Sequence, residues 1–296
     1  MPEIQEHSKS ICWTAGVVAA VCLLGVACTG GDPGPRQGTP AWFFEAAKDN
    51  FAILDYTKTV EQLKEAARAE GDLGMEAGVW RFVLTGGLAL GYDELADAFV
   101  KGAAVNDEMI DAFQPSINDY RRRTRVNAIQ FAEGIGPIEK LLEEQETVTL
   151  NVPLPSGNNS ASPLLGSVEA GNTVDAQLTA MVDQTLTRGV FSALSTLTGG
   201  KEFSELTQES EAGSIQASAT DLSFGVARLM LDVSIMFDKE GLNDPKIRAH
   251  ILNLAQEWAA PHLENEELAE RVEEFEFDIE NERRDVEGKR RIKKDD

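Results

Sequence analysis

Apolar side chains recur every three or four positions along most of the chain after Trp42, the spacing that places them on one face of an α-helix. Several of these stretches begin or end at features that start or stop helices, such as Asp244 followed by Pro245, or the pair Gly199-Gly200. The pattern predicts helices over 42–54, 60–69, 80–99, 106–142, 178–197, 219–237, 245–260 and 264–288. We expect the helix over 106–142 to be interrupted at 134–137.

One apolar stripe predicts a long helix with several glycines beside it. Its members are Trp80, Leu84, Leu88, Tyr92, Leu95 and Phe99. Gly86, Gly87 and Gly91 lie beside the stripe. A glycine costs up to about 1 kcal/mol inside a helix. We therefore expect either close backbone packing against a neighbouring helix or a kink at this place.

Strict alternation of polar and apolar residues occurs over 147–152 and predicts one short strand or extended strut. A loop rich in proline, glycine and serine follows it. The expected fold is all-α, with helices paired in a bundle or an α-solenoid. We expect two helical halves, 41–145 and 173–296, joined by an extended connector over 146–172.

The start of the chain has the layout of a secretory signal. Lys9 precedes an apolar run from Ile11 to about Ala27, and Cys28 follows directly. The other cysteines of the chain both lie inside the apolar run. We expect residues 1–27 to be a signal peptide and residues 28–40, which are rich in glycine and proline, to be a flexible tether. An uncleaved membrane anchor is the alternative interpretation.

The segment Leu24–Cys28 resembles the bacterial lipobox. The resemblance implies that Cys28 is lipidated and becomes the first residue of the mature protein, which would then be held on a membrane by acyl chains. Thr29 follows the cysteine, whereas an aspartate at this position retains lipoproteins in the inner membrane in enteric-type sorting. The resemblance therefore implies a protein on the periplasmic face of an outer membrane.

A second resemblance rests on this acyl-anchored start, on the paired helices and on the segment Leu88–Phe99, which reads LALGYDELADAF. Together they resemble bacterial lipoproteins with tetratricopeptide-like repeats, and in particular the T-component family of tetratricopeptide-associated TRAP transporters. The resemblance is best over residues 41–145. It implies a tetratricopeptide-like helical fold and a role in the uptake of small ligands, often apolar or acidic, by a partner binding protein.

Composition limits the classes of partner. The formal net charge is −23, and 42% of the residues are apolar. Phosphate binding requires clustered lysine and arginine, so an acidic chain of this kind excludes nucleic acid as an expected partner. The apolar content is sufficient for a substantial core, and disorder of the body is not expected.

Candidate chemistry in the body is sparse. His250 and His262 lack a second pair of ligands at metal-binding spacing, and Thr198–Lys201 lacks the full phosphate-binding loop pattern. No serine lies in a glycine-flanked elbow. We expect neither an enzyme nor a cofactor or metal site.

Four residues are candidates for contacts with a ligand or partner. Arg121 and Arg125 belong to the one basic cluster of the body; they either contact an acidic partner or pair with nearby helices. Asp232 either forms an ion pair with Arg228, four residues earlier, or anchors a ligand in a cavity. Tyr92 either belongs to the core or lines a cleft between helices.

The sequence as a whole predicts a lipid-anchored helical protein of the cell envelope, facing the periplasm, which acts as a non-catalytic binding or scaffold module. The alternative is an accessory component of a TRAP-type uptake system that binds a small ligand in a cleft between helices. Both hypotheses include a membrane contact through the lipid anchor.

Overall fold

A computed structural model of the chain describes residues 34–143, 146–157 and 159–293. The predictions for the signal peptide 1–27 and for lipidation of Cys28 lie outside these residues, as does the first part of the predicted tether. From Gln37 onward the chain forms one unit, in which the predicted halves 41–145 and 173–296 share a single hydrophobic core.

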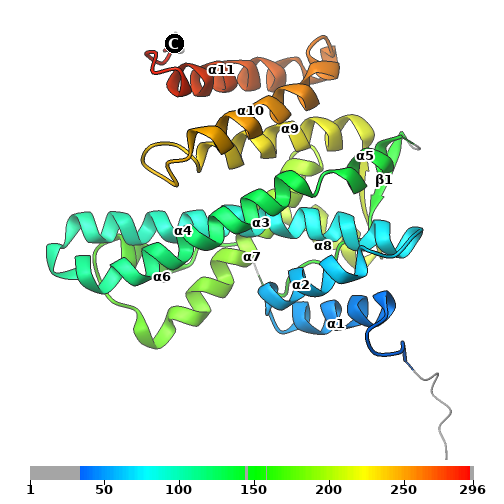
Figure 1. Cartoon of the computed structure of the whole chain (residues 1–296), viewed down its shortest axis with the longest axis horizontal. Coiled ribbons are helices and arrows are strands. Elements are labelled where there is room, and N and C mark those ends of the chain that lie inside the picture. The colour runs from blue at the N-terminus through cyan, green and yellow to red at the C-terminus, as the bar shows by residue number, and fades with distance from the viewer. Residues whose placement is uncertain (1–33, 144–145, 158, 294–296) are drawn as a thin grey trace, which may run out of the picture. The chain divides into compact units, whose positions relative to one another are not determined.

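The predicted all-α fold is confirmed, and consecutive helices such as α1 and α2, α3 and α4, and α9 and α10 pack closely against each other (Figure 1). The helices are α1 (Pro40–Ala52), α2 (Tyr56–Ala66), α3 (Asp72–Val105), α4 (Ile110–Glu133), α5 (Gly136–Leu142), α6 (Pro163–Glu169), α7 (Leu178–Leu197), α8 (Phe203–Glu211), α9 (Ala219–Ile235), α10 (Pro245–Ala259) and α11 (Ala269–Val286). The short helices α6 and α8 were not predicted; α6 lies inside the expected connector.

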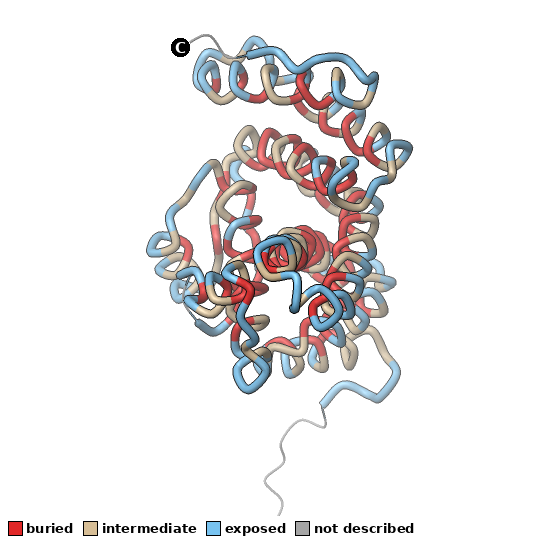
Figure 2. Tube along the Cα trace, turned by 90° about the vertical axis from the view of Figure 1, so that its left-hand side faces the viewer, coloured by how far each residue is buried: buried red, intermediate tan, exposed pale blue. Residues whose placement is uncertain are grey.

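The central helix of this unit is α3, which has 34 residues and is apolar on all sides along most of its length. Figure 2 looks along this helix and shows the other helices around it, with α10 and α11 stacked outside α9. The stripe that contains Trp80 and Tyr92 is buried, and the opposite side of α3 is buried too. Within the described residues, no helix combines the length and the apolar character needed to cross a membrane.

Glycines allow the backbones of α3 and α7 to touch. A Cβ atom added to Gly87 would lie 2.4 Å from the Cα atom of Val190, and one added to Gly189 would lie 2.3 Å from the carbonyl oxygen of Gly87. Gly91 faces Leu186 one turn further along. Of the two expectations for these glycines, close packing is therefore the one observed, and α3 runs without interruption from Asp72 to Val105.

The predicted strand is confirmed as β1 (Thr147–Leu150), which pairs antiparallel with β2 (Ile215–Ser218). The partner strand was not predicted. Val148 lies opposite Ala217 in the register, and both side chains are buried. The pairing joins the segment after α5 to the start of α9, because Ala219, the first residue of α9, donates its backbone N–H to the carbonyl oxygen of Glu146.

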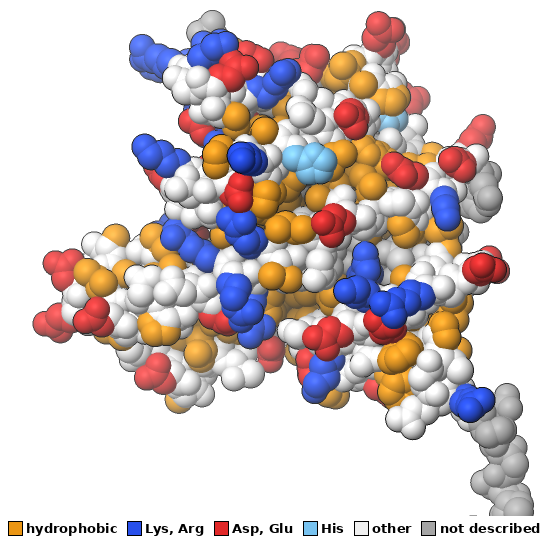
Figure 3. Space-filling model, viewed as in Figure 1, with side chains coloured by type: hydrophobic (Ala, Val, Ile, Leu, Met, Phe, Trp, Pro, Cys, Tyr) orange, Lys and Arg blue, Asp and Glu red, His pale blue; other side chains and the backbone are white. Residues whose placement is uncertain are grey.

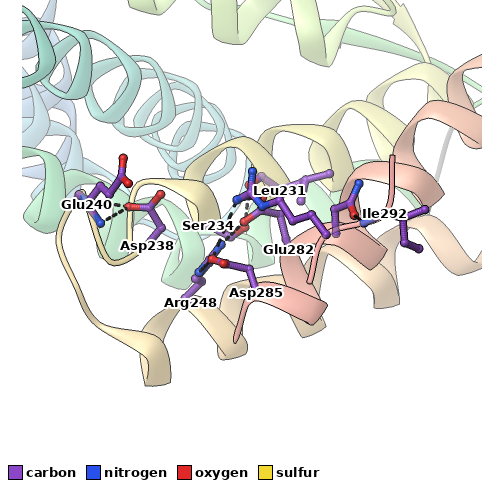
Figure 4. Close-up of polar contacts among 11 residues, drawn as sticks. Leu231, Ser234, Asp238, Glu240, Arg248, Glu282, Asp285 and Ile292 are labelled. Carbon is purple, nitrogen blue, oxygen red and sulfur yellow. Dashed lines mark hydrogen bonds and ion pairs between the residues drawn. The ribbon is translucent and has the colours of Figure 1, made fainter. Parts of the chain in front are cut away.

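Buried charge joins α10 to α11. Arg248 is 4% exposed and forms ion pairs with Glu282, which is 5% exposed, and with Asp285 at 2.7 Å (Figure 4). Glu282 also accepts a hydrogen bond of 3.0 Å from Arg291, and the backbone N–H of Ile292 donates to Asn281 at 2.6 Å. The basic segment after α11 is thus folded back onto that helix through residue 292.

The contact between α3 and α7 can be tested with a single methyl group. Gly87→Ala should lower the free energy of unfolding by about 2 kcal/mol, because the new Cβ atom meets backbone that cannot move aside easily. Chemical denaturation followed by circular dichroism measures the change.

Gly166→Ala is the matched control, because Gly166 lies in helix α6 with nothing within 4 Å of its added Cβ atom. This control should be neutral or stabilising by about 0.5 to 1 kcal/mol. Equal stability of the two variants would contradict the close packing.

Candidate functional site

A cleft with a volume of about 220 Å³ lies between three helices. Its walls include Thr57, Val60 and Glu61 of α2, Leu88 and Tyr92 of α3, and side chains of α4 from Arg122 to Gln130. We call it the Tyr92 cleft. Of the four candidate residues from the sequence, only Tyr92 lines it.

Tyr92 is held in place by aromatic and cationic neighbours. Its ring stacks on that of Tyr120 with centroids 6.2 Å apart, and the guanidinium carbon of Arg123 lies 5.5 Å from its ring centroid. Arg123 also donates a hydrogen bond of 3.2 Å to the Tyr92 hydroxyl. Since the hydroxyl oxygen accepts this bond, its own proton remains available to an acceptor in the cleft.

Asp119 fixes the two arginines of the cleft. It accepts hydrogen bonds from Arg122 at 2.6 Å and from Arg123 at 2.7 Å. Burial would raise the pKa of the Asp119 carboxyl, but these two hydrogen bonds outweigh it and leave the pKa below its usual value. Asp119 therefore stays ionised, and each guanidinium keeps further N–H groups for other acceptors.

The chemistry of the Tyr92 cleft is mixed. Guanidinium, hydroxyl and amide groups provide hydrogen-bond donors, while Val60, Leu88 and Val126 provide apolar surface. Planar guanidinium groups match the geometry of carboxylates, and apolar surface favours the rest of an organic molecule. This arrangement suits a small carboxylate with an apolar portion.

Arg121 and Arg125 lie one turn apart on α4 and turn away from the cleft toward the linker between α9 and α10. Arg121 donates to the carbonyl oxygen of Glu240 at 2.8 Å, and Arg125 forms an ion pair with Asp244 at 2.9 Å. Figure 3 shows basic side chains across the face on which α4 lies, with acidic side chains beside them. These two arginines hold the linker against α4; their role toward a partner stays a prediction.

Asp232 lies on α9 against α11. Its carboxylate is 3.3 Å from Arg228, as the spacing suggests, and Arg228 also contacts Asp278 of α11 at 2.8 Å. Burial raises the pKa of Asp232 to about 6, although Arg228 opposes the shift. The structure does not bring Asp232 to the Tyr92 cleft. A ligand-anchoring role for Asp232 stays a prediction.

Sequence reasoning missed Asp93, the neighbour of Tyr92 on α3. Its side chain is half-buried, and burial raises its pKa to about 7. The carboxylates of Asp97 and Asp238 add to the shift, while Arg121 opposes it. The sequence did show that Asp93 is a carboxylate beside an apolar stripe. It could not show that Asp238, in the distant linker between α9 and α10, lies close enough to raise the pKa of Asp93.

The structure also brings Ser223 and His262 together. Their Oγ and Nε2 atoms are 2.8 Å apart, and burial lowers the pKa of the imidazole. A catalytic pair of this type needs a third group to orient the histidine. Within the described residues, no carboxylate is hydrogen-bonded to the other ring nitrogen of His262. In the same part of the chain, no group of three His, Cys, Asp or Glu side chains lies close enough together to hold a metal ion.

Comparison with known proteins found no matching protein-family model, no matching curated protein and no matching solved structure.

The raised pKa of Asp93 predicts how stability depends on pH. The folded protein keeps the proton on this carboxyl up to about pH 7, whereas the unfolded chain loses it near the usual value of 3.8. The unfolded state therefore binds fewer protons between these values, and stability must fall as the pH rises through this window.

Asp93→Asn should remove this fall in stability at high pH, because asparagine does not titrate. At pH 8 the variant should exceed the wild type in free energy of unfolding by about 1 to 2 kcal/mol, a value reduced for partial solvent exposure, and the difference should shrink toward pH 4. Urea denaturation across the pH range measures it. Asp49→Asn, a change at an exposed carboxylate of α1 that is not among the groups shifting the Asp93 pKa, is the control and should show no such trend. If the difference in free energy of unfolding between Asp93→Asn and the wild type is the same at all pH values, the pKa of Asp93 is not raised in the folded protein.

Proposed function

We propose that this protein is a lipid-anchored protein of the bacterial cell envelope whose helical body binds a small ligand or a partner without catalysing a reaction. The anchor is Cys28, the tether is 28–40, and the body faces the periplasm, with the outer membrane as the favoured location. The ligand site is the Tyr92 cleft. The proposal combines the lipobox-like sequence with the geometry of that cleft.

The sequence around Cys28 supports the anchoring part. Small residues, Gly25 and Ala27, precede the cysteine, and an apolar run precedes them. Two or more acyl chains on one cysteine give stable attachment, because each buried methylene contributes about 0.8 kcal/mol. A tether rich in glycine and proline would let the body stand away from the membrane surface.

The observation that carries the binding part is the fixed arrangement of Tyr92 and Arg123. Asp119 and the hydrogen bond to Tyr92 hold the Arg123 guanidinium in place before any ligand arrives, and the stacked ring of Tyr120 holds Tyr92. A donor group that is already oriented loses little conformational entropy on binding. The cleft is therefore suited to a carboxylate recognised by Arg123 and by the Tyr92 hydroxyl.

An accessory role in solute uptake is the second candidate function. The observation that favours it is the position of the cleft between α2, α3 and α4, since the resemblance to the TRAP T components implies a small apolar or acidic ligand held between helices. Such a role would require a partner binding protein that receives or supplies the ligand.

The cleft hypothesis predicts a specific loss of binding. Benzoate and hexanoate, each a carboxylate with an apolar portion, should bind the purified protein, and Arg123→Lys should weaken binding at least tenfold, or about 1.4 kcal/mol. Lysine keeps the charge but loses the planar fork that contacts both Asp119 and Tyr92. Isothermal titration calorimetry gives the affinities.

Arg68→Lys provides the control, because Arg68 is an exposed arginine of the α2 region whose ion pair is with Glu65. It should leave the affinity unchanged. If neither carboxylate binds, or if both variants bind as the wild type does, the Tyr92 cleft is not the site.

The anchoring hypothesis predicts that the mature protein carries the additional mass of covalently attached acyl chains. Wild-type protein made in a bacterial host with a lipoprotein-processing pathway should start at Cys28 and carry acyl chains, and it should enter the detergent phase on partitioning. Cys28→Ser should abolish the acyl mass and the detergent partitioning, whereas Cys22→Ser, a change within the expected signal peptide, should preserve both. Intact-mass spectrometry decides the outcome, and an unmodified Cys28 in the wild type refutes the anchor.

A further inference from the structure

The wall that α4 gives to the Tyr92 cleft contains a hydrogen-bond acceptor as well as donors. Asn127 is 9% exposed and lines the cleft. Its amide nitrogen donates to the backbone carbonyl oxygen of Arg123 at 2.9 Å, which fixes which end of the amide is the oxygen Oδ1. Oδ1 has no hydrogen-bond partner among the described residues and keeps accessible surface. This acceptor is therefore open to an occupant of the cleft.

Arg123 presents donors one turn earlier on the same helix. Its Nε atom donates to Asp119 and its Nη1 atom to Tyr92, and the Nη2 atom has no acceptor in the described part of the chain. The side chain is 37% exposed, so that a ligand can reach it. Residues four apart on a helix have Cβ atoms about 5 to 6 Å apart. Free donors and a free acceptor thus lie next to each other on α4.

The wall formed by α2 adds a carboxylate. Glu61 lines the cleft, is exposed, and forms no hydrogen bond or ion pair within the residues that the structure describes. Cationic side chains of the same walls are engaged elsewhere, since Lys58 pairs with Asp55 at 2.7 Å and Arg122 pairs with Asp119 at 2.6 Å. A positively charged group of a ligand would therefore gain from an uncompensated carboxylate.

The size and the apolar surface of the cleft limit the rest of the ligand. Val126, directly before Asn127 on α4, is 44% exposed although its side chain is apolar. An apolar group placed against it would remove that surface from water. The cleft volume of about 220 Å³ lies below the range of about 300 to 1,000 Å³ that drug-sized ligands occupy. The occupant should therefore be smaller than such a ligand.

We propose that the Tyr92 cleft binds a free α-amino acid with an apolar side chain. The carboxylate contacts Arg123, and the apolar side chain covers Val126. The ammonium group donates to Asn127 Oδ1 and faces the carboxylate of Glu61. Both charged groups of an α-amino acid are attached to one carbon, which matches the adjacent donors and acceptor on α4. This inference rests on the proposed carboxylate site and names the class of its ligand.

The test compares hexanoate with L-norleucine, which is hexanoate with an ammonium group on the α-carbon. Isothermal titration calorimetry on the purified protein should show that L-norleucine binds at least tenfold more tightly. The reason is that hydrogen bonds of charged groups to a sheltered acceptor are stronger than those of exposed groups. Arg123→Lys should weaken the binding of both ligands.

Two substitutions remove the contacts of the ammonium group. Asn127→Leu keeps the approximate shape of the side chain; it should weaken the binding of L-norleucine at least tenfold without weakening that of hexanoate. Glu61→Gln should weaken the binding of L-norleucine about threefold, because an exposed charge contributes less. Glu45→Gln is the matched control, since this exposed carboxylate of α1 pairs with Lys48 and does not line the cleft. It should change neither affinity by more than twofold.

An acetylated ligand separates a free amino acid from the end of a peptide. N-acetyl-L-norleucine keeps the carboxylate and the apolar side chain but has no ammonium group, and it should bind no more tightly than hexanoate. If it binds as tightly as L-norleucine, the cleft suits the carboxyl end of a peptide, and the assignment to free amino acids is overturned.

The outcomes distinguish this inference from the proposed function. If hexanoate binds through Arg123 but L-norleucine binds no more tightly, or if Asn127→Leu leaves the ratio of the two affinities unchanged, the amino-acid assignment is overturned and the carboxylate site stands. If neither ligand binds, the proposed carboxylate site fails as well. Should Asn127→Leu fail to fold, the comparison of Glu61→Gln with Glu45→Gln and the acetylated ligand still decide the question.

Discussion

The backbone contact between α3 and α7 determines how the rest of the helices can pack. Gly87 and Gly189 bring the two helices closer than any side chain would allow. At this separation the α7 residue Thr187 reaches the hydroxyl of Tyr56 on α2, with the two oxygens 2.8 Å apart in a buried hydrogen bond. One close crossing thus positions α2 as well, and α3 becomes enclosed on several sides rather than on one.

Enclosure of α3 explains why its carboxylates have unusual surroundings. An amphipathic surface helix would keep Glu76 and Asp93 in water, but neighbouring elements partly cover both of them. Cations do not fully compensate, because the chain has 27 lysines and arginines for 50 acidic residues. Many of the arginines are also engaged elsewhere, as Arg248 is between α10 and α11. Burial therefore raises the pKa of both α3 carboxyls.

Local signals in the sequence were sufficient to predict the positions of most helices. They were insufficient to predict which elements pack or pair with each other. Asp244 followed by Pro245 marked the start of α10, because capping and the fixed φ of proline act within a few residues. The pairing of β1 with β2 was not predictable in this way, since the partner strand lies more than sixty residues away along the chain. Contacts of this kind depend on packing that periodicity does not encode.

The same distinction applies to the candidate site. Arg121 and Arg123 lie two positions apart on α4 and face different neighbours, since Arg121 donates to Glu240 and Arg123 to Tyr92. Which of them would meet Tyr92 depended on the crossing of α3 and α4. The α1–α2 hairpin then supplies one wall of the Tyr92 cleft, and the Tyr56 hydrogen bond to α7 and the ring contact of Phe51 with Trp80 fix this hairpin in place. Because the hairpin is held by these contacts, a ligand in the Tyr92 cleft meets a wall that is already formed, and its binding free energy is not reduced by the cost of ordering that wall.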